Sequence, residues 1–176
     1  MQRRMVEMEK QWRGLRGMHR MDGEETEFGI AMGRKYTTTH LWMQLLEQDK
    51  EKDEFTFKVG ISDFARIEYG EILRVTLPHL DDGDFNPEEV GSAGVALNEL
   101  GLDDLIVTIR FARDTLTIQP PFACEIIELN GEVEAHPELV NDDAYGDGWL
   151  LIVKPHRYDE EIFLEPNEYI ELLEDL

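Results

Sequence analysis

Short runs of alternating apolar and polar residues, separated by turn-forming residues, recur along most of this chain of 176 residues. Segments such as FTFKVGI (55–61), EILRVTL (71–77) and WLLIVKP (149–155) are typical of β-strands. Many short strands at close spacing favour an all-β sandwich or barrel. The last residues, EPNEYIELLEDL (165–176), place apolar side chains at helical spacing instead. The sequence therefore predicts a mainly β fold with flanking short helices and a C-terminal helix.

One pair of expected strands encloses a charged bend. LIVTI (105–109) is followed by RFARD (110–114) and then by TLTIQ (115–119), which is the pattern of a hairpin. Two of the five bend residues are arginines, Arg110 and Arg113. A rigid hairpin often presents its tip to a partner. We therefore consider two interpretations, a contact for an acidic partner or ligand and a merely solvated basic tip.

The N-terminal residues differ from the rest. Apolar residues recur there at steps of three and four, which predicts a helix over residues 1–22 with one apolar stripe. That stripe either packs on its own domain or docks on a partner. Residues 22–35 are polar and Gly-rich and are interpreted as a linker. We thus expect an N-terminal extension (1–35) and one domain (36–176). The stripe consists of Met5, Met8, Trp12, Leu15 and Met18.

The net charge of −22 is extreme and unevenly distributed. From Met1 to Arg20, six Lys/Arg stand against two Glu, whereas from Tyr36 onward nine Lys/Arg stand against 33 Asp/Glu. Such a chain repels phosphate groups, so we expect neither nucleic acid nor a membrane surface as a partner. The acidity serves solubility or steers the protein toward a basic protein partner.

Motifs of catalysis and metal binding are missing from the sequence. There is no GxSxG, phosphate-binding loop or dinucleotide fingerprint, and the five histidines lack HxH or HxxxH spacing. DGDFN (82–86) starts like a calcium loop, but Pro87 stands at its sixth position and Ala93 at its twelfth. The single cysteine, Cys124, excludes an internal disulfide and favours a cytoplasmic location. We expect no metal site and no enzyme; an acid-cluster hydrolase would need a site that these residues do not assemble.

Several segments, in order, resemble the glycine cleavage system H protein family. HPELVNDDAYGDGW (136–149) is similar to the family signature N-P-E-L-hydrophobic-N-x-x-P-Y-G-x-G-W and departs from it at His136 and Ala144. YTTTHLW (36–42) is similar to Y-T-x-T-H-E-W, and VGISDFARIEYGEILRVTLP (59–78) to V-G-I-T-x-F-A-x-x-x-L-G-D-I-x-x-V-x-L-P. The C-terminal residues resemble the closing helix of the family. The resemblance implies a lipoyl-domain-like barrel-sandwich hybrid of two small antiparallel sheets.

The resemblance also implies a role and a site. In the family, a lysine at a hairpin tip holds lipoate, and this arm carries an aminomethyl group between the enzymes of glycine cleavage. An ungapped alignment of the hairpin places Arg113 on that lysine, Arg110 on a glutamate three residues before it, and Cys124 on a turn glycine. In the family that glutamate helps the lipoate-attaching enzyme to recognise the hairpin. No lysine occurs between Lys58 and Lys154.

These substitutions lead to a prediction about function. Lipoylation forms an amide with a neutral amine, and the guanidinium of arginine does not lose its proton in proteins. We therefore expect no lipoate cofactor, and a non-catalytic binding or adaptor protein whose protein partners include glycine cleavage or lipoate-handling enzymes. The alternative is an ordinary aminomethyl/lipoyl carrier that is modified elsewhere. Arg110, Arg113 and His40 are the candidate partner contacts. His40 matches the histidine of T-H-E-W, with Leu41 in place of the glutamate, and a plain packed histidine is its alternative role.

Overall fold

The computed structural model describes residues 14–21, 24–78 and 98–175. Its strands are β1 (Gly14–Met21), β2 (Glu24–Ala31), β3 (Lys35–Tyr36), β4 (Leu41–Asp49), β5 (Glu54–Ile61), β6 (Ile72–Thr76), β7 (Glu99–Leu100), β8 (Val107–Phe111), β9 (Thr115–Ile118), β10 (Cys124–Leu129) and β11 (Leu151–Pro155). The described helices are α2 (Asp63–Tyr69), α3 (Glu132–Ala135), α4 (Glu138–Asp142) and α5 (Pro166–Glu174), with a 3-10 turn η1 (Glu160–Ile162). None of these helices is long and apolar enough to cross a membrane.

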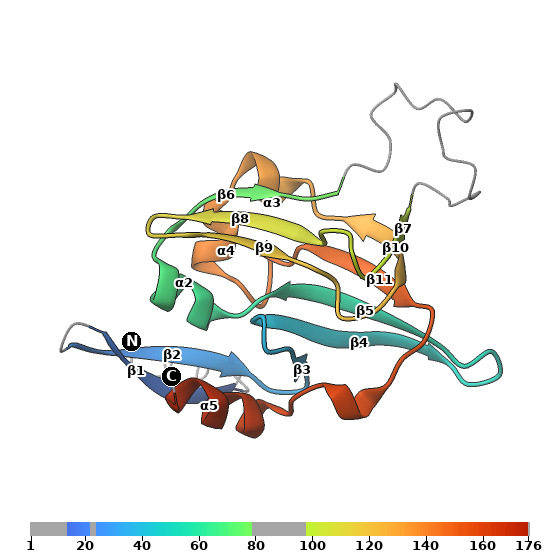
Figure 1. The fold of residues 1–176 in the computed structure, drawn as a ribbon, viewed down its shortest axis with the longest axis horizontal. Coiled ribbons are helices and arrows are strands. Elements are labelled where there is room, and N and C mark those ends of the chain that lie inside the picture. The colour runs from blue at the N-terminus through green and yellow to red at the C-terminus, as the bar shows by residue number, and fades with distance from the viewer. Residues whose placement is uncertain (1–13, 22–23, 79–97, 176) are drawn as a thin grey trace, which may run out of the picture.

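Two antiparallel sheets enclose the main core (Figure 1). The larger has the order β3-β4-β5-β11-β10-β7 and the smaller the order β6-β8-β9. Side chains that alternate along the strands, such as Val59, Ile109 and Val153, are fully buried between the sheets. This arrangement, with short helices and a helix at the C-terminus, confirms the predicted mainly β barrel-sandwich hybrid.

A second apolar cluster connects the larger sheet to α5. In it the rings of Tyr36 and Tyr169 stack with centroids 4.6 Å apart. The helix begins with a capping box between Glu165 and Glu168 and has a proline in its first turn. Its Tyr169 and Leu173 are buried, which explains the helical spacing of the last apolar residues. The members of this second core are Phe28, Ile30, Tyr36, Trp42, Phe64, Tyr169 and Leu173.

The described part of the N-terminal extension forms strands, so the predicted helix and linker are wrong there. β1 and β2 pair antiparallel from Gly14 opposite Ala31 to Met21 opposite Glu24. Phe28 and Ile30, two residues apart on β2, are both buried in the second core, and this burial outweighs the helical spacing of the stripe. Gly17 is required in β1, because a Cβ there would overlap the ring of Phe28.

Some predictions fall on residues that the structure does not describe. Met5, Met8 and Trp12 of the stripe lie outside the described residues. The division into an extension (1–35) and a domain (36–176) stays a prediction. Residues 79–97, with the calcium-loop-like DGDFN, are also not described. The two residues of β7 that follow pair with β10 at the edge of the larger sheet.

Candidate functional site at the hairpin tip

The hairpin predicted from the sequence is formed by β8 and β9. Their register runs from Val107 opposite Ile118 to Arg110 opposite Thr115. The amide of Phe111 donates to the carbonyl of Asp114 at 2.7 Å, so Ala112 and Arg113 form the tip. The tip is thus shorter than the expected five-residue bend. Arg110 belongs to β8 and is exposed, whereas Arg113 lies in the turn.

The tip is fastened to the end of α2. The amide of Arg113 donates to the carbonyl of Tyr69 (2.9 Å), and its Nη2 donates to the carbonyl of Ile67 (2.8 Å). Carbonyls in the last turn of a helix lack intrahelical partners, and a cation there is also favoured by the helix dipole. Gly70 follows the helix with φ +95°, a conformation that favours glycine. Arg113 therefore acts as a cap of α2.

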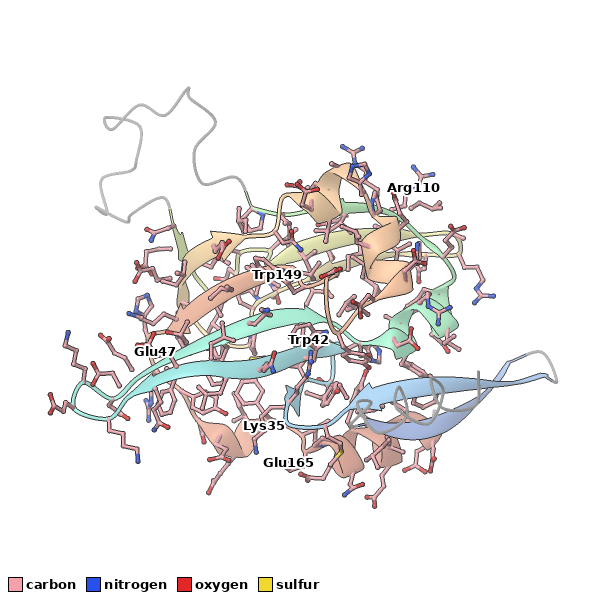
Figure 2. The ribbon with its side chains drawn as sticks, turned by 180° about the vertical axis from the view of Figure 1, so that it is seen from behind. Lys35, Trp42, Glu47, Arg110, Trp149 and Glu165 are labelled. Atoms are coloured by element: carbon pink, nitrogen blue, oxygen red, sulfur yellow. The ribbon has the colours of Figure 1, made fainter. Side chains whose placement is uncertain are left out.

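A second arginine stands directly opposite Arg110. Arg74 of β6 is its Cα partner across the smaller sheet, and both side chains are exposed. Like charges placed directly opposite one another are destabilising. Among the described residues, neither guanidinium has a carboxylate within salt-bridge distance. We call Arg74 and Arg110 the arginine pair; Figure 2 shows Arg110 on the outside of this sheet. The sequence did not predict Arg74 as a residue of this site.

His40 does not lie on this exposed surface. It is 8% exposed, and its Nδ1 lies 2.8 Å from the hydroxyl of Tyr169, which lies 2.7 Å from the Oγ of Ser62. Burial lowers the pKa of His40 to about 4, so the ring is neutral at pH 7. Its φ of +73° is unusual for a residue other than glycine. This is the geometry of a packed histidine.

A polar cavity of about 400 Å³ lies beside the tip, between α2 and α4. Arg113, Arg66 and Asn141 contribute to its lining. Arg66 pairs with Asp63 at 2.9 Å, and the amide group of Asn141 is bound to both backbone groups of Ile72. The bonds of Asn141 join α4 to β6, whereas the pair of Arg66 and Asp63 lies within α2. The lining supplies neither a thiol nor a hydroxyl nucleophile.

Chemistry is also limited elsewhere in the described residues. Cys124 is fully buried in β10, and burial raises its pKa to about 12, so the thiol stays protonated and unreactive. No group of three or more His, Cys, Asp or Glu side chains in the described ranges is arranged to hold a metal ion. The hairpin tip does not fit the attachment of lipoate either, because its exposed side chain is the guanidinium of Arg113.

Two facing antiparallel sheets with a projecting hairpin define a lipoyl-domain-type protein. Within that class, the chain belongs to the glycine cleavage H-protein family, whose model, "Glycine cleavage H-protein", matches residues 34–176. It is 34% identical to the probable glycine cleavage system H protein of Natronomonas pharaonis over 142 residues, which cover 81% of this chain and 94% of that protein.

Two further similarities agree with this assignment. The probable glycine cleavage system H protein of Thermococcus kodakarensis is 32% identical over 155 residues, which cover 87% of this chain and 98% of that protein. The crystal structure of a glycine cleavage system H protein from Mycobacterium marinum has a TM-score of 0.62 at 23% identity. The match covers 84% of this chain and 100% of that structure and shows the shared fold.

Proposed function

We propose that this member of the family is not lipoylated and acts as a non-catalytic binding or adaptor protein. The observation that carries the proposal is Arg113 at the tip of the β8–β9 hairpin. Its guanidinium does not form the amide by which lipoate is attached, and it already donates to the carbonyl of Ile67. No lysine between Lys58 and Lys154 replaces it on this hairpin.

The proposed contact surface consists of the arginine pair and the tip. Arg110 and Arg74 form an exposed basic patch in a chain of net charge −22 and suit an acidic group of a protein partner, such as a glycine cleavage or lipoate-handling enzyme. Arg113 adds its exposed charge beside them, while His40, which is 8% exposed, adds little contact area. The single buried thiol of Cys124 suits a reducing, cytoplasmic environment.

The test is the intact mass of the protein purified from its own host, grown with lipoate. The expected mass is that of the unmodified chain, because the tip offers no amine. An H protein that carries lysine at this hairpin position, expressed in the same cells, is the positive control. A lipoyl adduct on any lysine of this chain would contradict the adaptor proposal.

The rival function is an ordinary carrier that is modified elsewhere, and one observation favours it. Lys50 lies exposed in the turn between β4 and β5, where the carboxylate of Asp49 accepts the amides of Glu51 (3.1 Å) and Lys52 (3.3 Å). The turn thus presents an amine at a second hairpin tip. If an adduct is found, the double change Lys50→Arg/Lys52→Arg should abolish it, because both lysines lie exposed in this turn, and Lys58→Arg, at a half-buried position of β5, should retain it.

A further inference from the structure

The strand β4 has a free edge. On this edge, β3 pairs only with Trp42 and Met43. Gly33, which precedes β3, has a φ of +74°. Residues 45–49 pair with β5 on one side, and among the described residues no strand pairs with them on the other side. The amide of Thr37 donates to the carbonyl of Leu41, so the backbone groups of Leu41 face the side of β3. By alternation along an antiparallel strand, those of Leu45 also face this side, where they meet no partner strand.

An apolar groove of about 550 Å³ lies along this free edge. Leu45 is 46% exposed there, and Phe55 and Phe57 of β5 contribute to the floor. The ring of Tyr158 lies over both, with centroids 4.9 Å and 4.8 Å away. This volume is within the usual range for binding pockets, and it can accept apolar side chains from a strand added to the edge.

Two carboxylates, those of Glu160 and Glu165, line one side of the groove. Lys35 lies between these two and pairs with both, at 3.0 Å from Glu160. Figure 2 shows Lys35 beside Glu165.

Arg34, the second cation in the lining of the groove, also has interaction partners within the protein. Arg34 donates to the carbonyl of Tyr145 at 2.9 Å, and its guanidinium lies 4.3 Å from the centroid of the Trp42 ring. Lys35 faces two carboxylates and Arg34 is held by Tyr145 and Trp42, so neither cation is available to an acidic ligand. The net charge of −22 attracts a basic ligand instead.

We propose that the free edge of β4 binds an extended segment of a protein partner as an added strand. The segment pairs with the free backbone groups of β4 from Leu45 onward, places alternate apolar side chains in the groove, and directs Lys or Arg toward Glu160 and Glu165. This inference rests on the proposed adaptor function and states the chemistry of one partner segment. It concerns a surface formed by the larger sheet, whereas the arginine pair lies on the smaller one.

The experiment titrates the full-length protein with a short fluorescent peptide of alternating valine and lysine, at physiological ionic strength. Leu45→Glu should weaken binding by about tenfold or more, because it places a charge in the apolar groove. Leu73→Glu, at a leucine of β6 that is 49% exposed, is the matched control and should leave the affinity unchanged. Both variants add one negative charge, so attraction to overall charge alone would strengthen binding in both.

Further probes identify the outcomes that overturn the proposal. A peptide with N-methylated amides on its pairing edge should bind wild-type protein much more weakly, and equal binding would exclude strand addition. Equal binding of a valine–glutamate peptide would exclude the basic partner. A dimer of the wild-type protein that Leu45→Glu dissociates, measured by sedimentation, would show that a second copy occupies the edge instead. None of these results alters the intact mass, by which the adaptor function is tested separately.

Discussion

Arg113 places a guanidinium at the tip of the β8–β9 hairpin, and backbone groups at the end of α2 bind it. Arg113 donates to the carbonyl of Ile67, its backbone binds Tyr69, and Arg110 stands three residues before it. The side chain therefore stabilises the end of α2 in addition to contributing charge. If the protein is not lipoylated, as proposed, both Arg110 and Arg113 distinguish this tip from that of a carrier.

Restoring the lysine alone, Arg113→Lys, should not restore efficient lipoylation. Arg110 reverses a charge that the attaching enzyme is expected to contact, and such reversal is repulsive. Its direct effect on a nearby lysine in water is only about 1 kcal/mol, so recognition and not amine chemistry should limit the reaction. Modification by a lipoate-protein ligase in vitro should be much faster for Arg110→Glu/Arg113→Lys than for the single variant. Equal rates would show that the charge at position 110 does not matter.

His40 should make folding stability depend on pH. Its pKa is about 4 in the folded protein and 6.5 in the unfolded chain, so the unfolded state binds the proton first as the pH falls. This contribution is fully present above pH 6.5 and is lost between pH 6.5 and 4, by about 3 kcal/mol in all. Denaturant unfolding of His40→Asn should show a correspondingly smaller loss, since asparagine tolerates positive φ but does not titrate.

The matched control for this titration is His136→Asn. His136 is exposed, with 59% of its side chain accessible, so this variant removes a histidine without opening the core. The chain also contains 39 Asp and Glu residues, so the difference between the two variants is the informative quantity. The same pH dependence in wild type and His40→Asn would contradict burial of a neutral histidine.

Among the elements, the β1–β2 hairpin matters most for where the folded domain begins. Phe28 and Ile30 bury 99% and all of their surface, and Phe28 packs edge-on against Phe64 with ring centroids 5.1 Å apart. The hydroxyls of Tyr36 and Tyr145 donate to the backbone carbonyls of Ala31 (2.7 Å) and Gly29 (2.6 Å). The hairpin thus completes the second core.

A chain that begins at Gly33 should consequently be much less stable than the full chain. Loss of the buried Phe28 and Ile30 side chains alone removes about 3–6 kcal/mol of apolar burial. The melting temperature should fall by more than about 10 °C. Phe28→Ala should reproduce much of this loss, at about 3 kcal/mol, whereas Met32→Ala at an exposed position should change little. An unchanged melting temperature would instead support the separable extension that the sequence predicts.

In the described part of the molecule, the two proposed contact surfaces lie on different sheets. The arginine pair lies on the smaller sheet, and the groove lies along β4 of the larger one. Figure 2 shows Arg110 and Glu47 toward opposite ends of the protein, and Figure 1 shows the β8–β9 and β4–β5 turns at opposite ends as well. A protein with this distribution can contact an acidic group at one end and a basic segment at the other, as the two proposals require.

The sequence by itself indicated most strands of the two main sheets, the C-terminal helix, the family and the absence of lysine between Lys58 and Lys154. Alternation and helical spacing report which face of an element is buried, and this property is local to each segment. Likewise, the chemistry of Arg113 is a property of its side chain and is the same in any fold.

Only the tertiary structure decided which distant residues meet. The helical spacing of the N-terminal stripe was overridden because Phe28 and Ile30 find a buried surface formed by α2 and α5. Arg74 faces Arg110 because of the strand register, and His40 meets Tyr169 across 129 positions of sequence. The free edge of β4 exists because β3 covers only two of its residues. Strand register and core packing depend on contacts between distant segments, so they cannot be predicted from any single segment of the sequence.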